Sequence, residues 1–204
     1  MLQHLDDDNT ILLIRHGHRP PIPRGCLGND IKLSKEGREA AYVLGQKLKH
    51  IKWRNIQTSP VERCVETADY ILKGLGQKIK INRSSVLGDP GPFIVDPIKA
   101  APIFLETPLN NIMHNILSSR TPLGVRSLHE GSELFLSYLH TMHKLPCLMI
   151  SHDSIIALLY AYFFKTMNIN EYIPDFLEGL VITKKSDGVV IQNQEKSVFY
   201  PQKI

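Results

Sequence analysis

The chain alternates short apolar runs with longer segments in which apolar residues recur at helical spacing. The first run, Ile11 to Ile14, is continuously apolar, as expected of a buried strand. The segment 34–51 then predicts a helix, with Ser34 as the N-cap residue. Its apolar positions fall on one face and are Ala41, Leu44, Leu48 and Ile51.

The same alternation continues through the next forty residues. Residues 53–59 predict a second strand, and residues 60–75 predict a helix with Pro60 in its first turn. The apolar positions of this helix are Val61, Val65, Ala68 and Leu72. Residues 78–82 alternate apolar and polar side chains, which predicts a further short strand.

Residues 86–130 interrupt this pattern. They hold six of the thirteen prolines and show no clean periodicity before about residues 106–117. Long irregular segments inside compact domains are usually functional loops or disordered. We therefore interpret 86–130 as a small, irregular cap over a binding site.

Regular patterning returns after the predicted cap. Residues 131–145 predict a helix, 146–151 a strand, 153–167 a helix, and 177–193 a hairpin that turns at 186–188. Alternating strands and helices predict a three-layer α/β/α sandwich with a mostly parallel central sheet. We expect a single domain over residues 1–204 with the cap as its insertion.

Composition and charge narrow the range of functions. The net charge is +4, and Lys and Arg are not clustered, so nucleic-acid binding is not indicated. The longest strongly apolar run, 154–164, is too short to span a bilayer, and the N-terminus lacks a signal-peptide pattern. Three widely spaced cysteines indicate a reducing compartment. We expect a cytoplasmic protein without a membrane span.

Candidate chemistry gathers at the ends of three predicted strands. The stretches "RHGHR", "TSP" and "SHD" each follow a strand, and ligands of open α/β sheets bind at the carboxyl ends of the strands. Arginine forks match phosphate oxygens, and phosphoryl transfer depends mainly on positioning and charge stabilisation. The residues expected in this phosphoryl pocket are Arg15, His16, Arg19, Arg63, His152 and Asp153.

Three motifs resemble the histidine phosphatase superfamily: "RHGHRP" at 15–20, "SPVERCVETA" at 59–68 and "SHD" at 151–153. The segments "LSKEGREAAYVLGQKL" and "HEGSELF" are also similar to segments of that family. The resemblance implies that His16 is a nucleophile and forms a phosphohistidine that water hydrolyses. It further implies that Arg15, Arg63 and His152 hold the phosphate, to which we add Arg19, and that no metal or organic cofactor is needed.

Two aspartates are candidates for the proton donor to the leaving group. Asp153 follows His152 directly, which resembles the acid phosphatase and phytase branch, where this aspartate is the general acid. Asp89 lies close to the position of the acidic donor in the phosphoglycerate mutase branch. We favour Asp153 and keep Asp89 as the alternative. Structural roles are also open, with Asp153 as a helix N-cap and Asp89 as a turn residue.

Other charged residues and other functions were weighed against this interpretation. Lys99, Arg120 and Arg126 lie in the predicted cap, where they either contact a second anionic group or are simple surface charges. A metal-dependent hydrolase is disfavoured because Arg15 and Arg19 would repel a divalent cation. A phosphomutase and a non-catalytic phosphate-binding module are the remaining alternatives. We expect a metal-independent phosphatase acting on a small phosphorylated substrate or a phosphoprotein.

Overall fold

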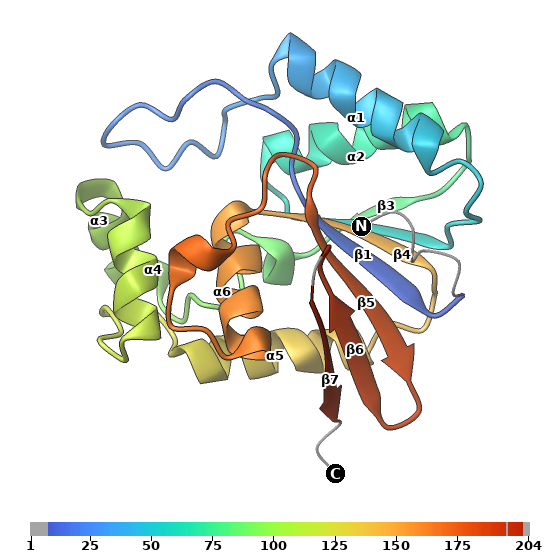
Figure 1. The fold of residues 1–204 in the computed structure, drawn as a ribbon. Helices are drawn as coiled ribbons and strands as arrows, with labels where there is room; N and C mark the ends of the chain where they lie inside the picture. The colour runs from blue at the N-terminus through green and yellow to red at the C-terminus, as the bar shows by residue number, and fades with distance from the viewer. Residues whose placement is uncertain (1–7, 195, 202–204) are drawn as a thin grey trace.

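The strands lie in one mixed sheet in the order β3-β2-β4-β1-β5-β6-β7 (Figure 1). The computed structural model describes residues 8–194 and 196–201. Within these residues the strands are β1 (Thr10–Arg15), β2 (Asn55–Thr58), β3 (Ile81–Arg83), β4 (Cys147–Ser151), β5 (Gly179–Lys185), β6 (Gly188–Gln192) and β7 (Ser197–Pro201). Strands β3, β2, β4 and β1 pair in parallel, whereas β5, β6 and β7 extend the sheet in antiparallel pairs.

Helices cover both faces of this sheet, as the alternating pattern predicted. They are α1 (Lys35–Lys47), α2 (Glu62–Leu75), α3 (Pro97–Glu106), α4 (Leu109–Leu117), α5 (Leu128–His140) and α6 (Asp153–Phe164), with short 3-10 helices η2 (Ser85–Leu87) and η3 (Ile169–Glu171). Figure 1 shows α1 and α2 over one face of the sheet, and α5 and α6 over the other. The predicted α/β sandwich is confirmed.

Strand β1 supplies both hydrophobic cores because successive side chains of a strand point to opposite faces. Ile11 and Leu13 pack in the core that includes side chains of α5 and α6. Leu12 and Ile14 pack in the core that includes side chains of α1 and α2. All four side chains are fully buried. The continuous apolar run is therefore explained by a central strand with helices on both faces.

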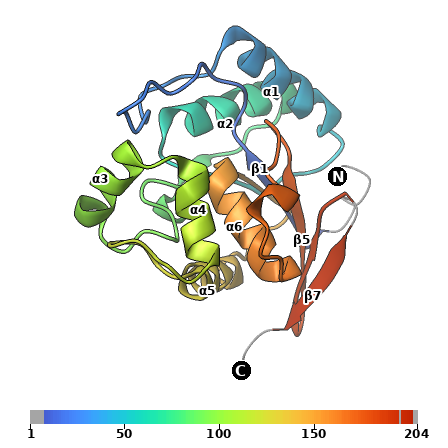
Figure 2. The ribbon, with the colours of Figure 1, turned by 60° about the vertical axis from the view of Figure 1, so that its left-hand side comes forward.

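The cap contains more regular structure than the sequence pattern indicated. Within 86–130 the chain forms α3 and α4, and Ile94 pairs with Val125 in an isolated antiparallel bridge. Helix α3 starts with Asp96 as N-cap and Pro97 in its first turn, and it holds Pro102 in its interior. Because Pro102 reads as a helix breaker, the sequence pattern did not indicate this helix. Figure 2 shows α4 beside α6, with α3 farther out.

The remaining elements agree with the sequence to within a few residues, with two exceptions. Ser34 caps α1 through a hydrogen bond from the backbone N–H of Gly37, as predicted. Pro60 lies before α2 rather than in its first turn, because Val61 is the N-cap. Strand β7 was not anticipated. No helix of the part of the chain that the structure describes is long and apolar enough to cross a membrane.

Candidate active site

Three neighbouring parallel strands bring the motifs together. Arg15 at the end of β1 lies opposite Ser151 at the end of β4, and Thr58 of β2 lies opposite Ile150 of β4. The backbone pairing continues past the strand ends, where the N–H of His16 donates to the carbonyl of Ser151 at 3.0 Å. The convergence predicted for "RHGHR", "TSP" and "SHD" is therefore found in the fold.

His16 is held in one orientation and one tautomer. Its Nδ1 lies 2.8 Å from the carbonyl oxygen of Gly17, which only accepts, so Nδ1 carries the proton. Its Nε2 accepts a hydrogen bond from Nε of Arg63 at 3.1 Å. Burial, followed by the nearby His152 and Arg63, holds the pKa of His16 well below its usual range. His16 is thus a neutral imidazole whose unprotonated nitrogen faces Arg63.

Arg63 lies in the first turn of α2 and connects both histidines to the loop after β1. Beyond its bond to His16, it donates through NH1 to the carbonyl of Gly28 at 2.7 Å and through NH2 to Nδ1 of His152 at 3.1 Å. Nε2 of His152 then donates to Oγ of Ser59 at 3.0 Å. Burial, followed by the charge of Arg63, lowers the pKa of His152 to about 3. Both histidines are accordingly neutral beside a buried guanidinium.

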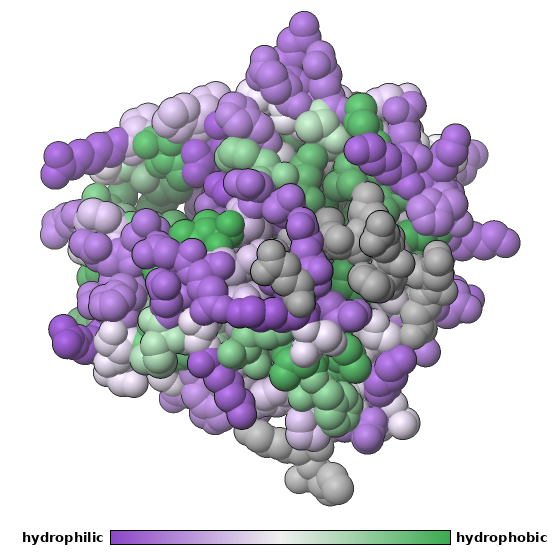
Figure 3. Space-filling view, in the orientation of Figure 1, coloured by the Kyte–Doolittle hydropathy of each residue, from purple (hydrophilic) through white to green (hydrophobic). Residues whose placement is uncertain are grey.

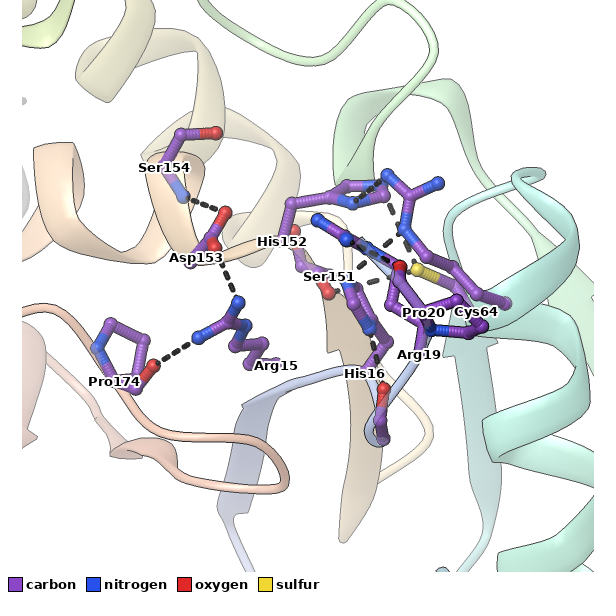
Figure 4. A network of polar contacts seen from close by, with 12 residues as sticks. Arg15, His16, Arg19, Pro20, Cys64, Ser151, His152, Asp153, Ser154 and Pro174 are labelled. Carbon is purple, nitrogen blue, oxygen red and sulfur yellow. Dashed lines mark hydrogen bonds and ion pairs between the residues drawn. The ribbon is translucent and has the colours of Figure 1, made fainter. Parts of the chain in front are cut away.

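Arg15 and Asp153 form an ion pair at the side of this cluster (Figure 4). NH2 of Arg15 lies 2.7 Å from Oδ2 of Asp153, and NH1 donates to the carbonyl of Pro174 at 3.0 Å. The guanidinium also stacks on the ring of Phe176, 4.0 Å from its centroid. Asp153 is the first residue of α6 and accepts from the N–H of Ser154, while His152 takes the N-cap position. Arg15 is therefore bound to the proposed acid.

Arg19 and Asp89 also contribute to the site. Both line the cavity that contains His16. Arg19 donates to the carbonyl of Pro20 at 2.9 Å, and its buried Nε has no hydrogen-bond partner among the described residues. Asp89 is exposed and has a positive φ of 54°, and its Oδ1 accepts from Asn29 at 3.4 Å. Both candidate acids thus reach the same cavity.

Three supporting residues were not singled out from the sequence. Ser59 accepts the hydrogen bond of His152, and Thr67 accepts from the N–H of Gly17 at 2.9 Å and donates to the carbonyl of Arg63 at 2.7 Å. A Cβ on Gly88 would lie 2.4 Å from Nε2 of His152. Ser59 and Thr67 lie inside the quoted "SPVERCVETA" motif, so their position was available but their partners depend on the fold.

The cavity lies between the loop after β1, the cap and the start of α6, and its volume is about 270 Å³. Its polar lining is formed by His16, Arg19, Asn29, Arg63, Asp89, His152, Asp153 and Ser154. Most of the remaining lining is apolar and comes largely from α3, α4 and α6. Figure 3 shows hydrophobic side chains around a hollow on the left of the molecule, where the loop after β1 approaches α3.

The three basic residues of the cap do not line this cavity. Arg126 donates through NH1 to the carbonyls of Pro92 and Ile94. It therefore joins two parts of the cap through hydrogen bonds. Lys99 pairs with Asp96 at 3.1 Å, and Arg120 is exposed. Their surface and structural roles, one of the two alternatives weighed above, are the ones observed.

The donor set of the site suits an anion. Cationic nitrogen and imidazole groups surround the cavity end at His16, and arginine is well matched to phosphate oxygens. Within residues 8–194 and 196–201, no group of three or more His, Cys, Asp or Glu side chains is placed to hold a metal ion. The arrangement combines a neutral nucleophilic nitrogen, fixed cations and two carboxyl groups.

Comparisons with known proteins show which family the chain resembles. The family model described as histidine phosphatase superfamily (branch 1) matches residues 11–84, which include His16 and Arg63 but not His152 or Asp153. The chain is 33% identical over 97 residues to the mitochondrial serine/threonine-protein phosphatase Pgam5 of Drosophila willistoni. That alignment covers 46% of this chain and 33% of the relative, so the chain matches about a third of that protein's length.

Solved structures show the same fold. A phosphoserine phosphatase variant of Entamoeba histolytica in complex with phosphoserine has a TM-score of 0.64 and 16% identity, covering 90% of this chain and 95% of that one. A phosphoglycerate mutase of Bacillus anthracis has a TM-score of 0.60 and 16% identity, covering 95% and 92%. The resemblance to the histidine phosphatase superfamily and the fold that it implied are confirmed.

Proposed function

We propose that this protein is a metal-independent phosphomonoester hydrolase that acts through a phosphohistidine on His16. The observation that carries the proposal is the fixed tautomer of His16, whose Nδ1 donates to the Gly17 carbonyl while Nε2 faces Arg63. A nucleophilic nitrogen must carry no proton, and burial with cationic neighbours keeps Nε2 unprotonated while it accepts the hydrogen bond of Arg63.

The reaction runs in two steps. Nε2 of His16 attacks phosphorus, the ester P–O bond breaks, and the leaving alkoxide takes a proton from the carboxyl group of Asp153. Water then attacks the phosphohistidine and gives a proton to the Asp153 carboxylate, which releases inorganic phosphate and restores neutral His16. Each proton lost by Asp153 is thereby regained within one turnover.

The phosphate oxygens are held by Arg15, Arg19, Arg63 and His152 in this proposal. The unpartnered Nε of Arg19 supports its role, because a buried donor gains most from a new acceptor. In the absence of substrate, Asp153 is bound to Arg15 in an ion pair. A dianionic substrate competes with Asp153 for Arg15, and this competition makes the carboxyl group available as an acid.

Hydrolysis is tested by measuring inorganic phosphate released from an aryl phosphate and a panel of natural phosphomonoesters in the presence of EDTA. The panel includes a phosphopeptide, because the aligned relative is named a serine/threonine-protein phosphatase. We expect turnover to survive EDTA and to be lost in His16→Ala. His50→Ala, at an exposed position in the loop after α1, is the matched control. Equal rates in wild type and His16→Ala would contradict the phosphohistidine mechanism.

The acid is identified by comparing Asp153→Asn with Asp89→Asn. Loss of the general acid slows alkyl esters, whose alkoxide needs a proton, by about 10²-fold or more, and slows a p-nitrophenyl ester far less. We expect this pattern for Asp153→Asn. The same pattern for Asp89→Asn would transfer the acid role to Asp89. Phosphate appearing on an added acceptor alcohol, with little free phosphate, would instead identify a phosphomutase.

The cellular compartment is part of the same proposal. Cys26, Cys64 and Cys147 are free thiols. Free thiols fit a reducing compartment, and we propose the cytoplasm.

A further inference from the structure

The cavity has two chemically different ends. One end carries the charged and imidazole groups around His16. The other end is formed by the cap and α6, where the lining side chains are Phe93, Phe104, Ile112, Met113, Ile116 and Leu158. A substrate whose phosphoryl group contacts His16 therefore places its organic part among apolar side chains.

At the apolar end of the cavity, no described lining residue offers a positive charge to a second anionic group of the substrate. Among the described residues that line the cavity, the cationic side chains are Arg19 and Arg63. Both lie at the phosphoryl end. The other charged lining residues are Asp89 and Asp153, and both are acidic. A second phosphate or a carboxylate on the substrate would meet like charge and no cation.

Hydroxyl-rich substrates are also disfavoured. A sugar hydroxyl buried without a partner loses its hydrogen bonds to water, which weakens binding. Apart from the two histidines at the phosphoryl end, Asn29 and Ser154 are the uncharged polar side chains among the described lining residues, and Asn29 already donates to Asp89. The apolar surface of α3 and α4 instead favours an organic group that loses water readily.

We propose that the substrates are phosphomonoesters of apolar alcohols, aryl or branched alkyl, that carry no second charge. This inference rests on the proposed function and names the substrate class of the same site. Phe104 on α3 is the specificity-determining side chain that we single out. It is only partly buried and packs against the outside of the core that includes side chains of α5 and α6.

Binding of non-hydrolysable phosphonates tests the substrate class without requiring turnover. Titration calorimetry compares benzylphosphonate with methylphosphonate and phosphonoacetate, which share the phosphoryl group but differ in the attached group. We expect benzylphosphonate to bind at least about tenfold more tightly than methylphosphonate, and phosphonoacetate to bind more weakly than both. Equal affinities, tighter binding of phosphonoacetate or no binding of benzylphosphonate would overturn the inference.

Variants of α3 test whether Phe104 determines the preference for benzylphosphonate. Phe104→Ala should remove most of the preference for benzylphosphonate over methylphosphonate. Leu105→Ala is the matched control, because Leu105 is the next residue of α3, is 37% exposed and does not line the cavity. Ala101→Lys, which places a cation at the apolar end, should raise the affinity for phosphonoacetate. A preference that survives Phe104→Ala and falls in Leu105→Ala would contradict the role of Phe104.

Hydrolysis of matched alkyl esters separates failure of this inference from failure of the proposed function. Benzyl phosphate, glycerol 3-phosphate and 3-phosphoglycerate all have alcohol leaving groups. If glycerol 3-phosphate or 3-phosphoglycerate is cleaved fastest in a reaction that requires His16, hydrolysis stands and the apolar substrate class is wrong. If none is cleaved while benzylphosphonate still binds selectively, the hydrolase proposal fails and the ligand class is supported.

Discussion

At the scale of single residues, Arg63 has the largest number of roles in the site. Its three nitrogens contact His16, His152 and the carbonyl of Gly28, so one guanidinium orients two imidazoles and the loop after β1. Burial lowers the pKa of Arg63, yet a guanidinium stays charged at any useful pH. A lysine would supply the charge but could not make the three directional bonds from one planar group.

The position of His152 depends on the absence of a side chain at Gly88. We expect Gly88→Ala to lower kcat/KM about 100-fold, because the new Cβ would lie 2.4 Å from Nε2 of His152 and 2.6 Å from Oγ of Ser59. Gly88 also has a φ of 146°, at which any side chain is strained. Steady-state kinetics and the midpoint of chemical denaturation are measured on the same samples.

Gly76→Ala separates displacement of His152 from backbone strain. Gly76 has a φ of 65° at the C-terminus of α2, and a Cβ there would have no heavy atom within 4 Å. Its replacement should cost about 1 kcal/mol of stability and leave kcat/KM unchanged. If both variants lose activity in proportion to their stability, the close approach to His152 is not what Gly88 provides.

At the scale of elements, the hydroxyl of Thr67 joins α2 to the loop after β1. It accepts from the N–H of Gly17, next to His16, and donates to the carbonyl of Arg63. Thr67→Val keeps the shape but leaves the N–H of Gly17 unpaired in a buried place, which costs about 1–3 kcal/mol of unfolding free energy. We expect kcat to fall as well, because Gly17 adjoins His16.

Thr67→Ser is the control because it restores the hydroxyl and removes a methyl group. Guanidinium denaturation and kcat are compared across wild type, Thr67→Val and Thr67→Ser. A serine variant with near wild-type kcat would support the hydrogen bond as the important feature. A valine variant as active as the serine variant would show that the link between α2 and the loop is dispensable.

The elements differ in how far the sequence could predict them. Apolar runs and helical spacing located β1 to β4, α1, α2, α5, α6 and the β5–β6 hairpin, because buried side chains recur at regular spacing in most of these elements. Helix α3 was missed because Pro102 in its interior reads as a breaker, whereas the fold tolerates it at an exposed position. Strand β7 alternates exposed and half-buried residues, so it lacks a strong apolar stripe.

The residues of the candidate site were predictable from the sequence, whereas several of their contacts were not. The strand-end motifs identified His16, Arg63, His152 and Asp153 because residue type and chain position are enough to propose a phosphoryl site. The pairing of Arg15 with Asp153 and the contact of Gly88 with His152 depend on loops that approach from distant parts of the chain. Such contacts leave no periodic signal in the sequence. A glycine or a serine in a loop can be present for many different structural reasons, so its residue type alone does not reveal the contact.

At the scale of the whole molecule, the two neutral histidines couple stability to pH. The pKa of His16 lies well below its usual value and that of His152 is about 3, whereas both are about 6.5 in the unfolded chain. Below pH 6.5 the unfolded state therefore binds protons that the folded state does not. Stability is highest above pH 6.5 and falls as the pH decreases toward the folded-state values.

We expect His152 to remove about 1.4 kcal/mol of unfolding free energy per pH unit below pH 6.5, or about 2 kcal/mol between pH 6.5 and 5, and His16 to act in the same direction. Urea denaturation of wild type and His152→Gln at several pH values between 7.5 and 5 measures the slope. The variant should lose the part of the slope that His152 contributes, even if its stability at pH 7.5 is lower. His50→Gln, at an exposed site, should keep the wild-type slope. An unchanged slope in His152→Gln would mean that His152 gains its proton equally in both states, and its buried neutral form would then be wrong.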